Sequence, residues 1–126
     1  MFNFELQYTR SDIANSVGGR NVGYLPRRNG IILAGCFNED QDPDCPNQIQ
    51  VGSRNDVITH AELLISQPNT IFPVFTKESE NSKHYRYRGL FQFVSHTSDK
   101  DELAKAEERS GRHGELTYLL NLVRAT

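Results

Sequence analysis

Residues 85–94 carry the clearest pattern in the chain, because apolar and polar side chains alternate along most of this segment. Tyr85 and Tyr87 share one side of the pattern, and Arg86 and Arg88 share the other. A period of two residues is typical of a β-strand with one buried face. The opposite face of this strand is polar and positive, which argues against a helix covering it.

Shorter segments extend the expected sheet. Their alternation or apolar character predicts strands over residues 2–8, 31–34, 48–52 and 71–75. Pro73 favours an edge position or a strand start for the last of these. Two segments stay open, since residues 58–66 fit a helix capped at Asp56 or a strand, and residues 116–123 fit a strand or a helix.

Two helices are predicted from their capping residues. One covers residues 13–17, after the capping residues 9–12 and before two glycines. The other covers residues 99–109, with Ser98 or Asp99 as its cap. Short strands, one or two short helices and long polar loops favour an α+β fold with a curled sheet or small barrel, in a single domain over residues 1–126.

Composition excludes several classes of protein. The 126 residues contain no apolar run of about 18 residues that would span a membrane, and the N-terminus has no basic start. Two cysteines provide neither a disulfide framework nor a zinc site. With 14 Lys and Arg against 16 Asp and Glu, the net charge of −2 argues against a wholly basic nucleic-acid binder but not against a positive patch. We expect a cytoplasmic protein with no membrane partner.

Arginines cluster along the chain, several of them beside asparagines. Such loops and strand faces suit contacts with a nucleic-acid backbone. The candidate backbone-binding residues are Arg20, Arg27, Arg28, Arg54, Arg86 and Arg88. For any single arginine, a scattered solubilising charge is an equally good interpretation.

The segment 30–52 places an aromatic residue and a run of carboxylates between two strands. The first strand ends at Gly35, Phe37 follows, and the second strand ends at Gly52. A ring beside a carboxylate can form a base pocket, because the ring stacks on a flat heterocycle while the carboxylate accepts a hydrogen bond from an exocyclic amine. An acidic loop exposed to solvent is the alternative, and composition alone favours it.

Other chemistry fits the sequence less well. A calcium loop starting at Asp40 would have Cys45 where the sharp turn requires glycine and Val51 where a bidentate glutamate belongs. The four histidines show no metal-ligand spacing. Cys36 could act as a nucleophile with His60 or His96 as its base, but a lone cysteine beside a strand is more often a small core residue. We therefore expect no metal, no cofactor and no catalytic residue.

Taken in order, these segments resemble the SRA (SET and RING-associated, YDG) domain family, which reads modified cytosine in DNA. Residues 31–40 and 50–52 resemble its strand, glycine, aromatic, acidic run and second strand. Residues 73–77 and 85–91 resemble its Pro-Val-x-Val-x-Arg and Tyr-Arg-Tyr-Asp-Gly-Leu-Tyr strands. Residues 8–13 resemble the start of the SRA-like domains in bacterial methyl-directed (type IV) restriction endonucleases, so the resemblance spans residues 8–94.

This resemblance implies a PUA-like, strongly curved β-barrel that takes a flipped cytosine with a 5-methyl, 5-hydroxymethyl or bulkier group. By the same resemblance Phe37 forms one stacking wall and Asp40 accepts from the exocyclic amine. Gln50 and Val51 supply the second wall and backbone contacts, and Asn38 lies in the same pocket. The second wall is usually tyrosine, and Arg88 stands where the family has its aspartate. These departures fit a bacterial or phage-directed reader.

The expected function is a DNA-binding module without catalysis of its own. Its partners would be duplex DNA carrying modified bases and a fused or associated nuclease domain of a modification-dependent restriction system. An alternative is a glycosylase or nuclease acting on modified DNA, with Asp40, Glu39 or Asp42 as base or metal ligand. A second alternative is a YTH- or EVE-like reader of a modified RNA base.

Overall fold

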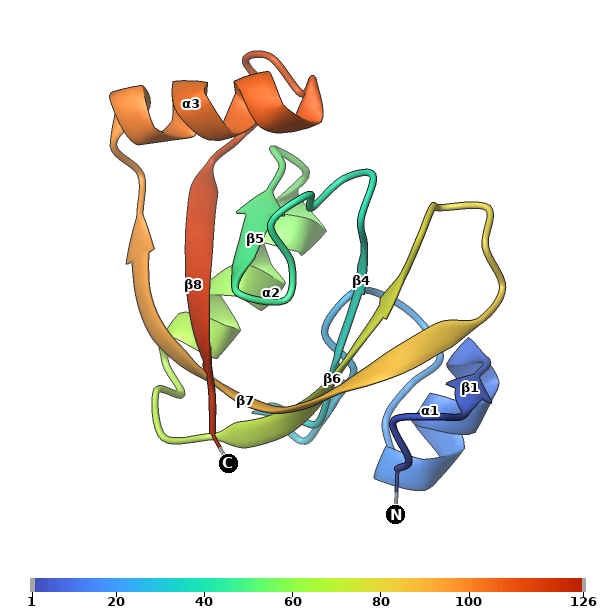
Figure 1. Cartoon of the computed structure of the whole chain (residues 1–126). Coiled ribbons are helices and arrows are strands. Elements are labelled where there is room, and N and C mark those ends of the chain that lie inside the picture. Colours follow the sequence, from blue (N-terminus) through green and yellow to red (C-terminus); the bar gives the residue numbers. More distant parts are fainter. Residues whose placement is uncertain (1, 126) are drawn as a thin grey trace.

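The longest strand, β7 (Tyr85–Thr97), organises the sheet in this computed structural model, which describes residues 2–125. Figure 1 shows the sheet bending strongly along β7. Its strands follow the order β4-β6-β7-β8-β5, and a short β1 also pairs with β7. These strands are β1 (Gln7–Tyr8), β4 (Gly35–Asn38), β5 (Gln48–Val51), β6 (Ile71–Lys77) and β8 (Tyr118–Arg124).

The sheet is mixed and open. β4 runs parallel to β6, and the other pairs are antiparallel. Within residues 2–125, β4 and β5 each pair with a single strand of this sheet, so strand pairing does not close it into a barrel. A separate hairpin joins β2 (Arg27–Arg28) to β3 (Ile31–Ile32) through Asn29 and Gly30, both with positive φ.

A bulge at Gly89 lets one strand serve two cores on opposite faces of the sheet. The register with β6 shifts at this point, and Gly89 has a φ of 111°, a conformation that favours glycine. Before the bulge, Tyr85 and Tyr87 pack in a cluster with Phe75; after it, Phe91 and Phe93 pack in the main core. The alternation in the sequence is therefore real, but the buried side changes at the glycine.

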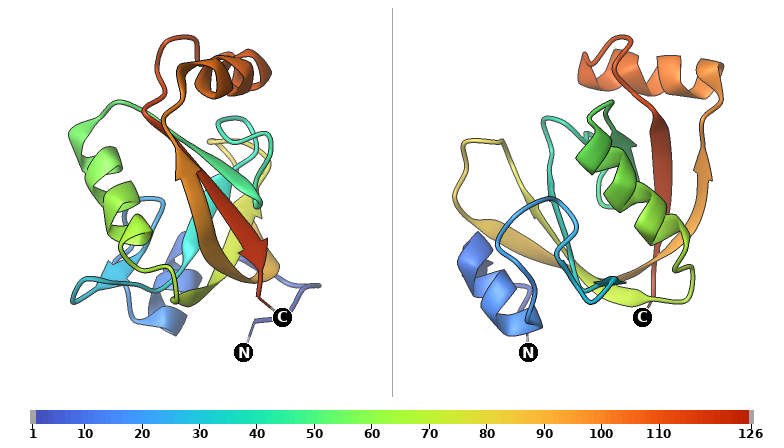
Figure 2. Two further views of the ribbon diagram at one scale, coloured as in Figure 1. Left: turned by 90° about the vertical axis from the view of Figure 1, so that its left-hand side faces the viewer. Right: turned by 180° about the vertical axis from the view of Figure 1, so that it is seen from behind.

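Three helices complete the α+β fold: α1 (Arg10–Val17), α2 (Asn55–Ile65) and α3 (Lys100–Ser110). Ala61 and Leu64 pack α2 into the main core, whereas Leu103 and Ala106 hold α3 over Leu119. Figure 2 shows α2 within the bend of the sheet and α1 and α3 at opposite ends. Among residues 2–125, no helix combines the length and apolar character needed to cross a membrane.

Several sequence predictions are confirmed. The strands near 48–52, 71–75 and 85–94 are present as β5, β6 and β7, and the two helices are α1 and α3. Thr9 and Asp12 form a capping box, Gly18 ends α1 in the left-handed conformation, and Asp99 caps α3. The structure also resolves the two open segments, since residues 58–66 lie mostly in α2 and residues 116–123 mostly in β8.

Other predictions are wrong in position or number. Of the strand expected over 2–8, only Gln7–Tyr8 pairs, because Leu6 N bonds to Asn3 O and Glu5 N to Asn3 Oδ1, which folds residues 3–6 into a turn. Of the strand expected over 31–34, only Ile31–Ile32 form a strand, β3, and residues 33–34 connect it to β4. The strand that precedes the carboxylates is β4, which begins at Gly35, where the sequence predicted that a strand would end. Residues 2–125 contain three helices, not one or two.

Candidate functional site

A cavity of about 310 Å³ lies between β4 and β5, the strands at the two ends of the order β4-β6-β7-β8-β5. Phe37 from β4, Gln50 from β5 and Asp42 from the connecting loop are buried residues in its lining. The loop crosses the opening between the two strands in Figure 1. Exposed residues such as Arg54 and Glu115 contribute to the same lining. The lining of the cavity thus includes buried apolar and acidic side chains as well as exposed charged ones.

Two aromatic rings form one side of the cavity. Phe37 is almost completely buried, and its ring centroid lies 6.4 Å from that of Tyr24, with the planes inclined at 53°. Tyr24 is held in place because its hydroxyl donates to Val57 O (2.7 Å) and its carbonyl accepts from Cys36 N (2.9 Å). The two inclined rings make this side of the cavity apolar, but they do not form a parallel sandwich.

Asp42 is the buried carboxyl of the cavity, with 6% of its surface exposed. Its Oδ1 accepts from Gln50 N at 2.7 Å, and within residues 2–125 Oδ2 makes no hydrogen bond. Burial raises the pKa of Asp42 to about 7, although the Gln50 N–H and the Arg112 guanidinium oppose this shift. A carboxyl with such a pKa exists in both protonation states near neutral pH.

Gln50 brings a second polar group to the cavity. Its Nε2 donates to Ala106 O in α3 at 3.0 Å, which fixes the orientation of the amide. Its Oε1 is buried without a hydrogen-bond partner in the described structure. Because a buried acceptor without a partner is unfavourable, a ligand donor that reached this atom through a small movement of the cavity lining would stabilise it.

The end of α3 and the following loop hold the cavity wall in place. Arg112 Nη1 donates to Gln41 O (3.3 Å) and to Gln50 O (3.2 Å), so it ties the loop to β5. Arg109 forms an ion pair with Asp44 (2.6 Å) and donates to Gln48 Oε1 (3.1 Å). The acidic loop is therefore tied to β5 and to the region of α3, although Glu39, Asp40 and Asp44 are exposed and only Asp42 is buried.

The structure brings together only part of the predicted pocket. Phe37, Asn38 and Gln50 line the cavity. Val51 lies in the main core, and Asp40 is exposed and outside the cavity lining. The reason is a turn in which Asp42 N bonds to Asn38 O (2.9 Å) and Gln41 N to Asn38 Oδ1 (2.8 Å). This turn leaves Asp40 on the outside and directs the chain back so that Asp42 reaches β5.

The predicted arginines fall into separate places. Arg20, Arg27 and Arg28 line a hollow of about 560 Å³ together with the β2–β3 turn. Arg54 lies at the cavity, where it forms a bidentate ion pair with Asp56 (2.7 and 3.1 Å).

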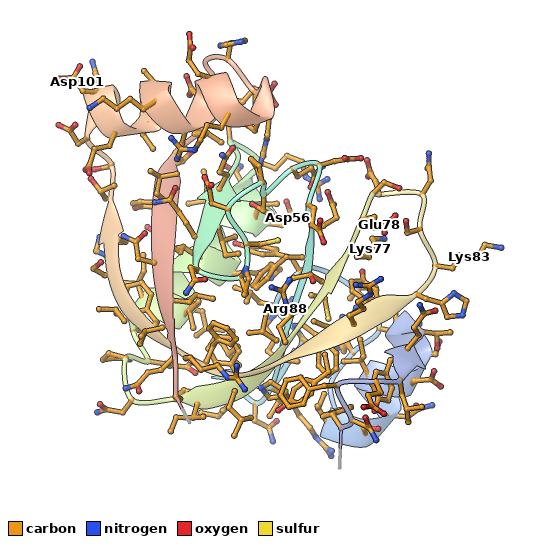
Figure 3. All side chains as sticks on the ribbon, viewed as in Figure 1. Asp56, Lys77, Glu78, Lys83, Arg88 and Asp101 are labelled. Atoms are coloured by element: carbon orange, nitrogen blue, oxygen red, sulfur yellow. The ribbon has the colours of Figure 1, made fainter. Side chains whose placement is uncertain are left out.

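The two arginines of β7 also separate. Arg86 lines another hollow beside Lys77, Lys83 and His84. Arg88 differs from the other arginines, because it donates to Thr76 Oγ1 (3.0 Å) and lies within the curve of the sheet in Figure 3.

Sequence reasoning did not select Tyr24 or Arg112, and it named Asp42 only in the enzyme alternative. The available signals were weak: Tyr24 stands among turn-forming residues, and Arg112 follows the glycine that ends α3. Both reach the cavity only through the tertiary fold. No local pattern would have identified them.

The remaining candidate chemistry finds little support in the described structure. Within residues 2–125, no three His, Cys, Asp or Glu side chains are grouped so that they could hold a metal ion. Cys36 is buried, and burial raises its pKa to about 12, so the thiol stays protonated near neutral pH.

Comparison with known proteins gives no further guide. The chain matches no protein-family model, no curated protein and no solved structure.

Proposed function

We propose that the chain binds duplex DNA and takes a modified cytosine, turned out of the stack, into the cavity between β4 and β5. The single observation that carries this proposal is a buried carboxyl with a free oxygen beside an aromatic wall, in a cavity lined from both unpaired strand edges. In this proposal the open, curved sheet is a PUA-like, SRA-like fold. Asp42 takes the position in the pocket that the family resemblance gives to Asp40.

The size of the cavity supports a base with a substituent. A cavity of about 150 Å³ is known to hold benzene, a single six-membered ring. The cavity here is about 310 Å³, which leaves room for a pyrimidine ring and a group attached to it. Turning a base out of the duplex costs a few kcal/mol, and stacking on Phe37 or Tyr24 would offset part of that cost.

Positive residues around two other hollows would bind the DNA backbone. One group is Arg20, Arg27 and Arg28, and the other is Lys77, Lys83 and Arg86, whose hollow is also lined by Glu39 and Glu78. Contacts of this kind position the duplex without reading its sequence. A nuclease domain of a restriction system, fused or associated, remains the proposed partner, and the cytoplasm the proposed location.

Binding to a set of duplexes tests this function. The duplexes carry cytosine, 5-methylcytosine, 5-hydroxymethylcytosine or glucosylated cytosine at one site, and fluorescence anisotropy gives each Kd. We expect at least one modified duplex to bind about tenfold or more tightly than the plain one, because the cavity has room for the group on C5. Burial of that group contributes about 0.8 kcal/mol per CH₂, and a hydrogen bond to it adds about 0.5–1.5 kcal/mol. Asp42→Ala should remove this preference.

Asp40→Ala is the matched control, since Asp40 belongs to the same loop but is exposed. It should keep the preference, and both variants should keep the salt-dependent binding to plain DNA. Equal affinity of the wild type for all four duplexes would contradict the proposal. Tighter binding to single-stranded RNA than to duplex DNA would favour the RNA-binding alternative instead.

One observation favours a second function, cleavage of the bond between base and sugar. Asp42 is a buried carboxyl whose pKa is raised to about 7, and Glu115 is an exposed residue in the same cavity lining. Carboxyl groups with different environments are typical of acid and base partners in glycosidic hydrolysis. Free base and abasic DNA, measured by mass spectrometry after incubation with the same duplexes, would distinguish this enzyme from a binding module.

A further inference from the structure

Asp42 and Gln50 together offer a cavity ligand one donor and one acceptor, and this pair is more selective than a carboxylate alone. The inference about this pair rests on the proposed function, since it concerns how the same cavity would recognise a base. Each residue is buried, each lines the cavity, and each has one polar atom without a partner in residues 2–125.

The two oxygens of Asp42 are not equivalent. Oδ1 accepts from the backbone N–H of Gln50 at 2.7 Å, so it must keep a lone pair directed at that hydrogen. When the carboxyl is neutral, its proton therefore belongs on Oδ2. Oδ2 is the oxygen that no described residue contacts by a hydrogen bond.

The surroundings favour the neutral acid. Asp42 takes no part in the ion pairs of residues 2–125. Arg112 Nη1, from the loop after α3, donates to the carbonyls of Gln41 and Gln50. The titratable and charged groups that face Asp42 or share the cavity are Tyr24, Cys36, Cys45, Arg54, Arg112 and Glu115. Of these, the Arg112 guanidinium favours the ionised form, but the effect of burial is larger. A ligand that displaces water would remove still more solvation from the ionised form.

Gln50 supplies the complementary acceptor. Its Nε2 donates to Ala106 O, and exchanging the amide nitrogen and oxygen would set two oxygens against each other. The buried atom left without a partner is thus Oε1, which can only accept.

We propose that Asp42 and Gln50 form a two-point reader of an amidine edge, in which Asp42 Oδ2 donates its proton to a ring nitrogen and Gln50 Oε1 accepts from the neighbouring amino group. Cytosine and adenine present this arrangement on their Watson–Crick edges. Thymine and uracil present the reverse order, a ring N–H beside a carbonyl. An ionised Asp42 would instead repel the lone pair of the ring nitrogen and would accept from the amino group.

The test separates these two states of Asp42. Asparagine at position 42 keeps an acceptor for Gln50 N–H and a donor in place of the protonated oxygen, but it does not titrate. Binding of the preferred modified duplex is measured between pH 6 and pH 9, with the wild type, Asp42→Asn and Asp42→Ala, after circular dichroism confirms that each variant is folded. Asp40→Asn is the matched control.

We expect wild-type affinity to fall with rising pH, by up to about tenfold per pH unit above the pKa of Asp42 in the free protein, because binding then requires the uptake of a proton. Asp42→Asn should bind within about threefold of the wild type at pH 6 and lose this added pH dependence, whereas Asp42→Ala should bind weakly throughout. Asp40→Asn should follow the wild type. Wild-type affinity that rises with pH, together with loss of binding in a folded Asp42→Asn, would overturn the reader and leave the proposed function intact.

Free nucleosides test the reader if no modified duplex is preferred, which is the outcome that contradicts the proposed function itself. With ¹³C-labelled aspartate, the Asp42 carboxyl resonance should respond to cytidine and adenosine more than to uridine, and should stay at its protonated position in the complex. An equal response to all three, or none, would overturn the reader as well.

Discussion

At the scale of single residues, Asp42 makes folding stability depend on pH. Its pKa is about 7 in the folded protein, above its ordinary value of 3.8, because burial disfavours the carboxylate. Asp42 therefore destabilises the fold progressively as pH rises from about 4 to about 7, and the full cost applies above that range. The difference in pKa corresponds to at most roughly 4 kcal/mol.

Asp42→Asn should remove this cost. We expect its free energy of unfolding, measured by urea denaturation, to exceed that of the wild type by a few kcal/mol at pH 9 and by much less at pH 5. Asp40→Asn should change stability little at either pH, because Asp40 is exposed. If the difference in unfolding free energy between Asp42→Asn and the wild type is the same at both pH values, the pKa of Asp42 is not raised in the folded protein.

The sequence predicted a carboxylate pocket but could not choose its carboxylate. Glu39, Asp40, Asp42 and Asp44 lie within six residues, and composition treats them alike. The choice depends on two contacts. Asn38 closes the turn, and the backbone N–H of Gln50 in β5, eight residues after Asp42, donates to Asp42 Oδ1. Burial, and with it the unusual pKa, arises only after these segments meet.

At the scale of elements, the prediction from alternation worked where a strand has one buried face. β7 was expected on that basis, whereas its registers with β6 and β8, each with a shift, were not predicted. The bulge at Gly89 was not expected. Apolar and polar residues alternate in the sequence in the same way before and after it, so the pattern does not show that the buried face changes. α2 stayed ambiguous for a different reason: its helical face is buried only because the sheet curves around it.

Gly89 should be the least replaceable glycine of the sheet. Its φ of 111° disfavours any side chain, and an added Cβ would meet the Arg124 guanidinium. Gly89→Ala should cost about 1–3 kcal/mol of unfolding free energy, the usual range for a strained backbone position.

Gly30→Ala is the control for this change. Gly30 also has a positive φ, of 77°, but an added Cβ there would meet nothing within 4 Å. It should cost less, about 1 kcal/mol. Equal costs for the two variants, measured by thermal denaturation, would show that the bulge does not constrain the strand.

At the scale of the whole molecule, the distribution of charge is more informative than its sum. The chain has a net charge of −2, yet many acidic residues belong to α3 and its cap, at Asp99, Asp101, Glu102, Glu107 and Glu108. Figure 3 places Asp101 on α3 and Lys83 on the loop between β6 and β7, on opposite sides of the molecule. Arg20, Arg27 and Arg28 are grouped around a separate hollow. Acidic and basic side chains are thus partly separated on the molecule, and the proposed DNA backbone contacts belong to the basic regions.

The salt dependence of DNA binding tests whether those basic regions carry the contacts. Each phosphate neutralised by a protein cation contributes about −0.9 to the slope of log K against log salt concentration on duplex DNA. Arg28 is exposed in the hollow next to the β2–β3 turn, so Arg28→Gln should weaken binding to plain and modified duplexes alike and make the slope shallower by about one. Arg124→Gln is the control, because Arg124 is also exposed but lies over the Phe4 ring at the end of β8. If both variants keep the wild-type slope, Arg28 does not contact the DNA backbone, and the same measurement on Lys83→Gln tests the hollow of Lys77, Lys83 and Arg86.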